Sequence, residues 1–252
     1  MGKLIKKAQE KVDYFLGEMN DRLASILMGV GVFCSVVVLH ELLIVGNWSL
    51  LWWYIAGTLA FQILASGYVH RYVCHKSWEC PRWLDIFFAS TSGGLGVAPV
   101  IQWSAIHRQH HAHVDTEKDA HGPHFSIWHN LNVSFIPPRV KYVRDLLRNK
   151  LYRAQHKYYI PLSITTALLF VSLFGFSEWC FVYLTVVGHQ VASVYTGHWK
   201  WMPQNHLMAA IYSPEQYHNA HHENAQSARL GLVDIPYWLL IQWFPHNEGR
   251  RG

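Results

Sequence analysis

The chain has 252 residues, of which 51% are hydrophobic and 15% aromatic, and its formal net charge at pH 7 is +5. Its mean hydropathy is close to zero, so only part of the chain suits a lipid environment. Because the apolar residues occur in long runs, the positive charge indicates a surface that faces anionic lipid, and it argues against a nucleic-acid-binding protein.

Four apolar segments approach the roughly 20 residues that a helix needs to cross a bilayer. They form two hairpins with short turns at residues 46–47 and 175–178, and they cover residues 23–45, 48–69, 159–176 and 179–195. All 21 lysine and arginine residues lie on one side of these hairpins, which predicts that this side is cytoplasmic. We therefore expect an all-α integral membrane protein with four transmembrane helices and a cytoplasmic helical cap.

The predicted organisation has five parts. A basic cytoplasmic N-terminus (1–22) precedes the first transmembrane hairpin (23–69), and a cap segment (70–158) separates it from the second hairpin (159–197) and the final cap segment (198–252). The cap contains a further apolar stretch, 83–103, whose glycines and Pro99 make one continuous helix unfavourable. A single crossing there would also separate the histidines described next, so we expect this stretch to be interfacial or re-entrant. A last stretch, 230–244, is expected to form an interfacial helix.

Three histidine packets with the spacings HxxxxH, HxxHH and HxxHH lie in the predicted cap. Residues three and four apart share a helix face, so each HxxHH packet is expected to direct its imidazoles to one place. The two histidines of the first packet are about 140° apart on a regular helix, so they either straddle a helix end or serve different ions. The packet members are His70, His75, His107, His110, His111, His218, His221 and His222.

Eight imidazoles exceed the six positions around an octahedral ion, which favours two metal ions. Imidazole suits zinc, copper, iron and nickel, and the spacing does not choose among them. The alternative is that these histidines are surface polar residues of an interfacial cap, which is the commoner role for a single histidine. Three packets in one short chain favour metal binding.

With these packets, the sequence resembles the membrane fatty acid desaturases, and among them the stearoyl-CoA type. The resemblance runs from about residue 48 to 244. It rests on the ordered packets together with Gly67-Tyr-Val-His70-Arg71, Trp103, Asp115-Thr116, residues 155–159 and His218-Asn-Ala-His221-His222. It implies two iron ions, which use O2 and two electrons to insert a cis double bond, at the Δ9 position, into a saturated fatty acyl chain carried by CoA or by a lipid. Zinc has no redox chemistry and could not do this.

The resemblance also assigns individual residues. It makes the eight packet histidines metal ligands and adds His198 as a ninth, for which the alternative is an interfacial role beside two tryptophans. It assigns substrate binding to Thr58, Gln62, Trp103 and Lys157. Gln62 could instead bond to a neighbouring helix, and the basic run at 139–157, which includes Lys157, could equally hold the cap to anionic lipid.

The sequence departs from the family at two places. Val194 stands where related enzymes have an asparagine, four residues before His198, and Ala105-Ile106 replaces an arginine-aspartate pair that helps to hold acyl-CoA. CoA as the carrier is therefore open.

Other functions remain as alternatives. A lipid hydroxylase would need nearly the same centre. A haem electron carrier would use His40 and His189, but they lie at unequal depths, and a metal transporter would need histidines near the bilayer midplane. The sequence has no His-Pro-Gly-Gly haem-binding motif, so we expect a separate electron donor such as cytochrome b5 or ferredoxin.

Overall fold

The structure, a computed structural model, describes residues 26, 28–132, 139–197 and 206–248. Within these ranges the chain is helical, and β pairing is limited to an isolated bridge between Trp78 and His246. The first helix (Met28–Val45) ends in η1 (Glu41–Val45). It is followed by η2 (Trp48–Trp52), α2 (Trp53–Ala60), η3 (Phe61–Cys74), α3 (Arg82–Thr91), η4 (Ser92–Leu95), α4 (Val100–His113), α5 (Ile127–Asn132), η6 (Val140–Tyr142), η7 (Leu146–Arg148), α6 (Lys150–Lys157), α7 (Tyr159–Phe174), α8 (Phe176–Gly197), α9 (His206–Ile211), η8 (Pro214–Tyr217), α10 (His218–Glu223), α11 (Ile235–Leu239) and η9 (Ile241–Trp243).

Two described helices, Met28–Val45 and Trp48–Cys74, are long and apolar enough to cross a membrane. The number rises to as many as four if each of two bent helix pairs forms one span. These pairs are Arg82–Leu95 with Val100–His113, bent by 88°, and Lys150–Lys157 with Tyr159–Phe174, bent by 77°. The helices of the first predicted hairpin are thereby confirmed as membrane-helix candidates, and the four-span topology stays a prediction.

The helices differ from the predicted segments at two places. The helix that contains the predicted span 48–69 continues to Cys74, because the chain runs from α2 into a π-helix without a break. The predicted turn at 175–178 is a single residue, Gly175, whose φ of +116° is one that side chains disfavour. One left-handed glycine is enough to separate α7 from α8, so residues 176–178 already belong to α8.

The prediction that the apolar stretch at 83–103 does not form one continuous helix is confirmed. Gly96, with a φ of +90°, ends η4 in the left-handed region, and Pro99 immediately precedes α4. The 88° bend between these helices brings α4 against η3, while η4 packs on α7. The break therefore positions the second histidine packet, which lies on α4, beside the first packet at the end of η3.

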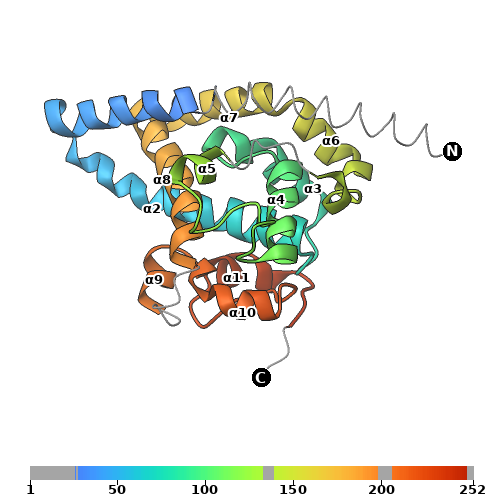
Figure 1. Cartoon of the computed structure of the whole chain (residues 1–252). Coiled ribbons are helices and arrows are strands. Elements are labelled where there is room, and N and C mark those ends of the chain that lie inside the picture. The colour runs from blue at the N-terminus through green and yellow to red at the C-terminus, as the bar shows by residue number, and fades with distance from the viewer. Residues whose placement is uncertain (1–25, 27, 133–138, 198–205, 249–252) are drawn as a thin grey trace.

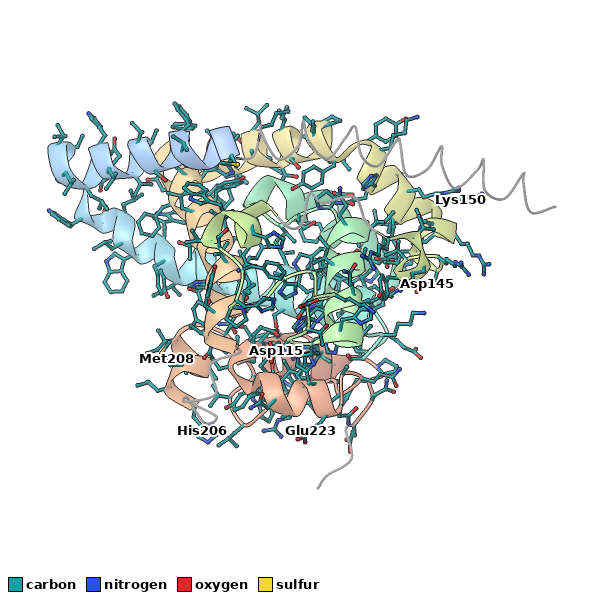
Figure 2. The ribbon with its side chains drawn as sticks, in the orientation of Figure 1. Asp115, Asp145, Lys150, His206, Met208 and Glu223 are labelled. Atoms are coloured by element: carbon teal, nitrogen blue, oxygen red, sulfur yellow. The ribbon has the colours of Figure 1, made fainter. Side chains whose placement is uncertain are left out.

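The remaining contacts gather the third packet at the same place. The α2 helix packs on α8, and η8, which directly precedes the third packet on α10, packs on both α8 and η3. In Figure 1 the elements α10 and α11 lie at the end of the molecule opposite to α7 and the first helix. The charged side chains of Asp145 and Lys150 lie at the outer edge of the molecule, beside α6 (Figure 2).

Candidate metal centre

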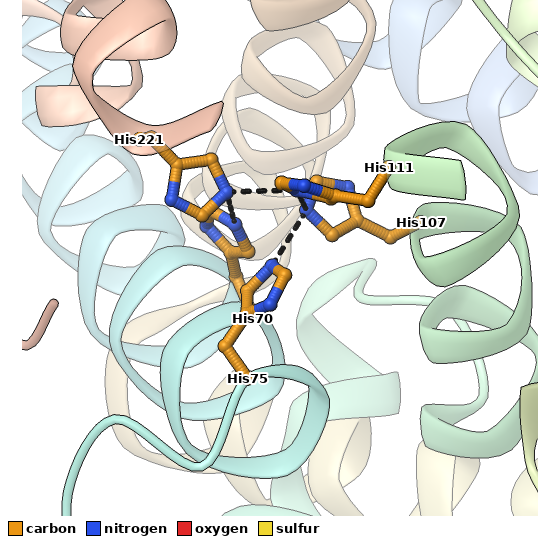
Figure 3. A group of neighbouring side chains, drawn as sticks. All are labelled: His70, His75, His107, His111 and His221. Carbon is orange, nitrogen blue, oxygen red and sulfur yellow. Dashed lines mark hydrogen bonds between the residues drawn. The ribbon is translucent and has the colours of Figure 1, made fainter. Parts of the chain in front are cut away.

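The eight packet histidines form two groups, and the ring nitrogens of each group are close enough together to hold one metal ion. In each group the possible ligand atoms all lie within 4.8 Å of one another. The second group is His110, His218 and His222. The first group, shown in Figure 3, is His70, His75, His107, His111 and His221.

The structure corrects the prediction that each HxxHH packet aims at one place. On α4, His107 and His111 belong to the first group, with their Nε2 atoms 3.0 Å apart, while His110 belongs to the second. On α10, His218 and His222 belong to the second group, with their Nε2 atoms 2.8 Å apart. His221, between them, belongs to the first group. Adjacent residues of a helix point about 100° apart, so neighbouring histidines serve neighbouring groups.

The first packet enters one group because its helix is a π-helix. In η3 the N–H of His75 donates to the carbonyl oxygen of His70 at 3.1 Å, and hydrogen bonds of this i to i+5 type bring residues five apart onto nearly one face. The two ring centroids are 4.9 Å apart. His75 is the C-cap residue of η3, so the predicted helix end at the first packet is confirmed, and the two rings belong to one group.

Each group contains one histidine whose Nδ1 atom faces a carboxylate, which is mostly buried in Glu215 and fully buried in Asp119. His70 Nδ1 lies 2.9 Å from Glu215 Oε1, and His110 Nδ1 lies 2.9 Å from Asp119 Oδ2. Burial alone raises the pKa of Glu215, but His70, Arg71 and Ser66 lower it by more, to about 2. Burial also opposes ionisation of Asp119, and the bond from His110 nevertheless lowers its pKa. Carboxylates of this kind hold the proton on Nδ1 and leave the Nε2 lone pair for a metal.

The protonation states and contacts of the rings fit a bound cation. Burial, and then the neighbouring rings, lower the pKa of His75 and His221 well below the ordinary value, so both rings are neutral, as metal ligands must be. Nε2 of His221 lies 2.9 Å from Nε2 of His70 and 2.9 Å from Nε2 of His111. If the Nδ1 atoms carry the protons, these facing nitrogens are all acceptors, and a cation between them removes their repulsion.

Sequence reasoning did not find the two carboxylates. Glu215 lies three residues before the third packet, and Asp119 lies nine residues after His110. The available signal was that an acidic residue lies close to the second packet and another close to the third, in a chain poor in acidic residues. The sequence analysis also missed His121, whose ring stacks on the His110 ring with the centroids 4.4 Å apart.

A largely apolar cavity of about 360 Å³ adjoins both groups. His70 and His107 of the first group and His218 of the second line it. The Trp103 ring lines it as well and stacks on His107 at 4.8 Å. The apolar lining also includes Phe61, Ala65, Ala98, Ile106, Tyr183, Leu184, Val187, Val191 and Val194. Ile106 and Val194, two of the three residues at which the sequence departs from the desaturase pattern, therefore border this cavity.

The other predicted substrate residues are not among the residues that line the cavity. Thr58 Oγ1 lies 2.9 Å from His189 Nε2, and the fully buried Gln62 donates to the carbonyl oxygen of Tyr212 at 3.4 Å. Lys157 is exposed at the end of α6, with its amine over the Tyr158 ring. His198 lies outside the described residues.

The structure gives no support to a haem held by His40 and His189. The His189 ring is engaged by Thr58 and enclosed by the rings of Tyr54, Phe61 and Tyr212. The His40 side chain is 59% exposed near the end of the first helix.

These features define a helical membrane protein with two adjacent histidine groups beside an apolar cavity. No family model matches the chain. It is 28% identical over 230 residues to the sn-1 stearoyl-lipid 9-desaturase of Anabaena variabilis, covering 79% of each chain. It is 27% identical over 244 residues to the icosanoyl-CoA 5-desaturase of Limnanthes douglasii, covering 82% of this chain and 67% of that protein. It is 28% identical over 242 residues to the sn-2 palmitoyl-lipid 9-desaturase of Nostoc, covering 81% and 82%.

The relatives are acyl-lipid and acyl-CoA desaturases, which are oxidoreductases. The predicted class of enzyme is therefore confirmed, and so is the resemblance to desaturases as a whole. Since the relatives differ in the position of the double bond and in the acyl carrier, they do not establish the stearoyl-CoA Δ9 type.

Proposed function

We propose that this chain is a membrane-bound di-iron fatty acyl desaturase, which uses O2 and two electrons to insert a cis double bond into a saturated acyl chain, at the Δ9 position. The observation that carries this proposal is the apolar cavity that ends on rings of both histidine groups. A hydrocarbon chain in that cavity lies directly beside the place where two metal ions would be held.

The chemistry explains why this site needs a redox metal. An unactivated C–H bond offers no handle for acid-base catalysis, and two bound iron ions would supply the redox chemistry with O2 that its cleavage needs. The eight packet histidines would hold them, with His198 as a ninth ligand. Glu215 and Asp119 fix two of the rings, so that their Nε2 atoms stay directed into the groups.

The cavity walls supply the grip on the substrate. An acyl chain has no polar groups along its length, and burial stabilises it by about 0.8 kcal/mol per methylene. Trp103 fixes the chain beside His107 through the stacking of its ring on the histidine. The same apolar walls keep bulk water away from the reacting carbons.

The proposed topology keeps the predicted four spans, with the histidines and both termini on the cytoplasmic side. Electrons then come from a separate cytoplasmic donor, such as cytochrome b5 or ferredoxin. The acyl carrier is CoA or a membrane lipid, since relatives of both kinds occur. Ile106 presents an apolar side chain to the cavity and offers no group to bind CoA.

Expression in a host of defined lipid composition tests the function. Chromatography of fatty acid methyl esters should show a new monounsaturated acid, and His110→Ala and His221→Ala should each abolish it, since they remove one ligand from each group. His113→Ala is the matched control, because His113 also lies on α4 but belongs to neither group. A hydroxy acid in place of the unsaturated acid would assign the chain to the hydroxylases, and product from both ligand variants would refute the metal centre.

A further inference from the structure

The first helix forms one wall of the apolar cavity. The residues that line the cavity from this helix are Met28, Gly31, Val32 and Ser35. Their spacing of three, four and seven residues places them on one helix face. Tyr183 and Leu184 of α8 contribute to the same cavity.

This wall lies far from the histidines. At the C-terminal end of α8, a Cβ added to Gly197 would lie 3.3 Å from the His218 ring, so this end adjoins the second group. Tyr183 lies fourteen residues earlier on the same helix, which at 1.5 Å per residue is about 21 Å away. The cavity lining thus extends from the metal ligands to a remote end beside Tyr183.

A buried cluster lies at that remote end. Cys34 and Val38 of the first helix pack with Leu50, Cys180 and Tyr183, and all five are buried. Tyr183 belongs both to this cluster and to the cavity lining. A chain that enters from the histidine side therefore meets this packed cluster at Tyr183, while Met28 and Val32 of the neighbouring wall are exposed.

Gly31 leaves space at this end. A Cβ built at Gly31 would have no other heavy atom within 4 Å, so a larger side chain fits there without a clash. Gly29 offers a matched comparison, because a Cβ there also meets nothing within 4 Å, yet Gly29 does not line the cavity. Two residues correspond to about 200° of rotation, so the two glycines face opposite sides of one helix.

We propose that Gly31 is a specificity-determining residue, and that its missing side chain sets the longest saturated acyl chain that the cavity accepts. The inference rests on the proposed function, since it assigns the cavity to an acyl chain. A larger side chain at position 31 should therefore shorten the part of the cavity that lies beyond the histidines, whereas a larger side chain at position 29 should not.

The first experiment compares the wild type with Gly31→Leu and Gly29→Leu in cells supplied with a graded series of saturated fatty acids. In Gly31→Leu the ratio of long to short unsaturated products should fall by roughly tenfold or more, because one methylene too many in a filled apolar pocket costs about 10–200-fold. Gly29→Leu should keep the wild-type ratio. Gly31→Ala, which disturbs the helix least, should give a smaller shift in the same direction.

A binding measurement separates this inference from the proposed reaction. Purified protein is titrated with a fluorescent fatty acid, which is then displaced by saturated acids of increasing length. Gly31→Leu should weaken displacement by the longest acids and leave the shorter ones unchanged. An unaltered length profile, or an equal loss for every length in folded protein, would overturn the role of Gly31. Length-selective binding without an unsaturated product would instead overturn the proposed desaturation.

Discussion

Single side chains hold the ligand rings, and Glu215 is the clearest case. Its carboxylate accepts from Ser66 Oγ at 2.5 Å and lies 2.9 Å from His70 Nδ1. We expect Glu215→Gln to weaken metal binding about 10–100-fold, because the amide no longer fixes the ring with the strength of a carboxylate. Iron retained during titration with a competing chelator measures this effect.

Glu223→Gln is the control for this change. Glu223 is exposed on α10 beside the third packet, at the outer edge of the molecule in Figure 2. It removes the same charge from the same part of the chain without touching a ligand ring. Equal metal retention by both variants would mean that Glu215 has no positioning role.

At the scale of elements, one buried ion pair joins the π-helix to the C-terminal segment. Arg71 Nη1 donates to both carboxylate oxygens of Asp234 at 2.8 Å, and both side chains are fully buried. Asp234 also accepts from the N–H groups of Leu230 and Tyr237. The pair thus fixes the helix that carries His70 against the segment that follows the third packet.

We expect Asp234→Ala to lower the free energy of unfolding by about 3–5 kcal/mol, because it leaves the Arg71 charge buried without its partner. Thermal unfolding in detergent measures the loss. Lys76→Met is the control: it breaks the exposed pair with Asp145, which contributes about 0–1 kcal/mol. If the two substitutions destabilise equally, the buried pair does not have the structural role assigned to it.

The elements also show which features of the site a sequence can predict. The three packets, the broken stretch at 83–103 and the apolar helices follow from residue type and spacing. The meeting of His70 with His75 does not, because it depends on a π-helix, whereas spacing arguments assume 3.6 residues per turn. The division of each HxxHH packet between two groups depends on where the facing helices lie, which spacing alone does not contain.

The carboxylates behind the rings were missed for a related reason. Glu215 and His70 are separated by 145 residues, and only the packing of η8 on η3 brings them together. For Gln62, in contrast, the resemblance assigned a role that the observed contacts do not reproduce. The resemblance assigns it to the substrate, whereas in the structure its amide bonds to the carbonyl oxygen of Tyr212.

At the scale of the whole molecule, the two groups join η3, α4 and α10, so bound metal should stabilise the entire fold. At a free concentration of about a thousand times the dissociation constant, a ligand adds about 4 kcal/mol to the free energy of unfolding. For a chain of this size, each kcal/mol corresponds to roughly 2–4 °C. We therefore expect a chelator to lower the unfolding temperature by about 10 °C.

The matched variants for this experiment are His75→Ala and His113→Ala. His75 belongs to the first group, whereas His113 bonds to Tyr142 Oη at 3.1 Å outside both groups. The chelator should still lower the unfolding temperature of His113→Ala, and it should have a smaller effect on His75→Ala. If the chelator lowered the unfolding temperature of both variants equally, metal bound to the histidine groups would not be what stabilises the fold.

Chemical labelling can test how the whole molecule is oriented in the membrane. Ser49, at the start of the helix Trp48–Cys74, and Lys118, in the loop after the second packet, are both exposed. If the histidines are cytoplasmic, a membrane-impermeant thiol reagent should label Ser49→Cys in intact cells. It should label Lys118→Cys only after the membrane is opened.

Cys80→Ser provides the background for both variants, because Cys34, Cys74 and Cys180 are buried and Cys80 is only partly so. The comparison is decisive because the helix Trp48–Cys74 separates Ser49 from the first packet. Its length and apolar composition suit a single crossing, so the proposed topology predicts that residues 49 and 75 lie on opposite sides of the bilayer. Labelling of Lys118→Cys alone in intact cells would place the histidines, and with them any electron donor, on the non-cytoplasmic side, and labelling of both positions from outside would contradict the single crossing.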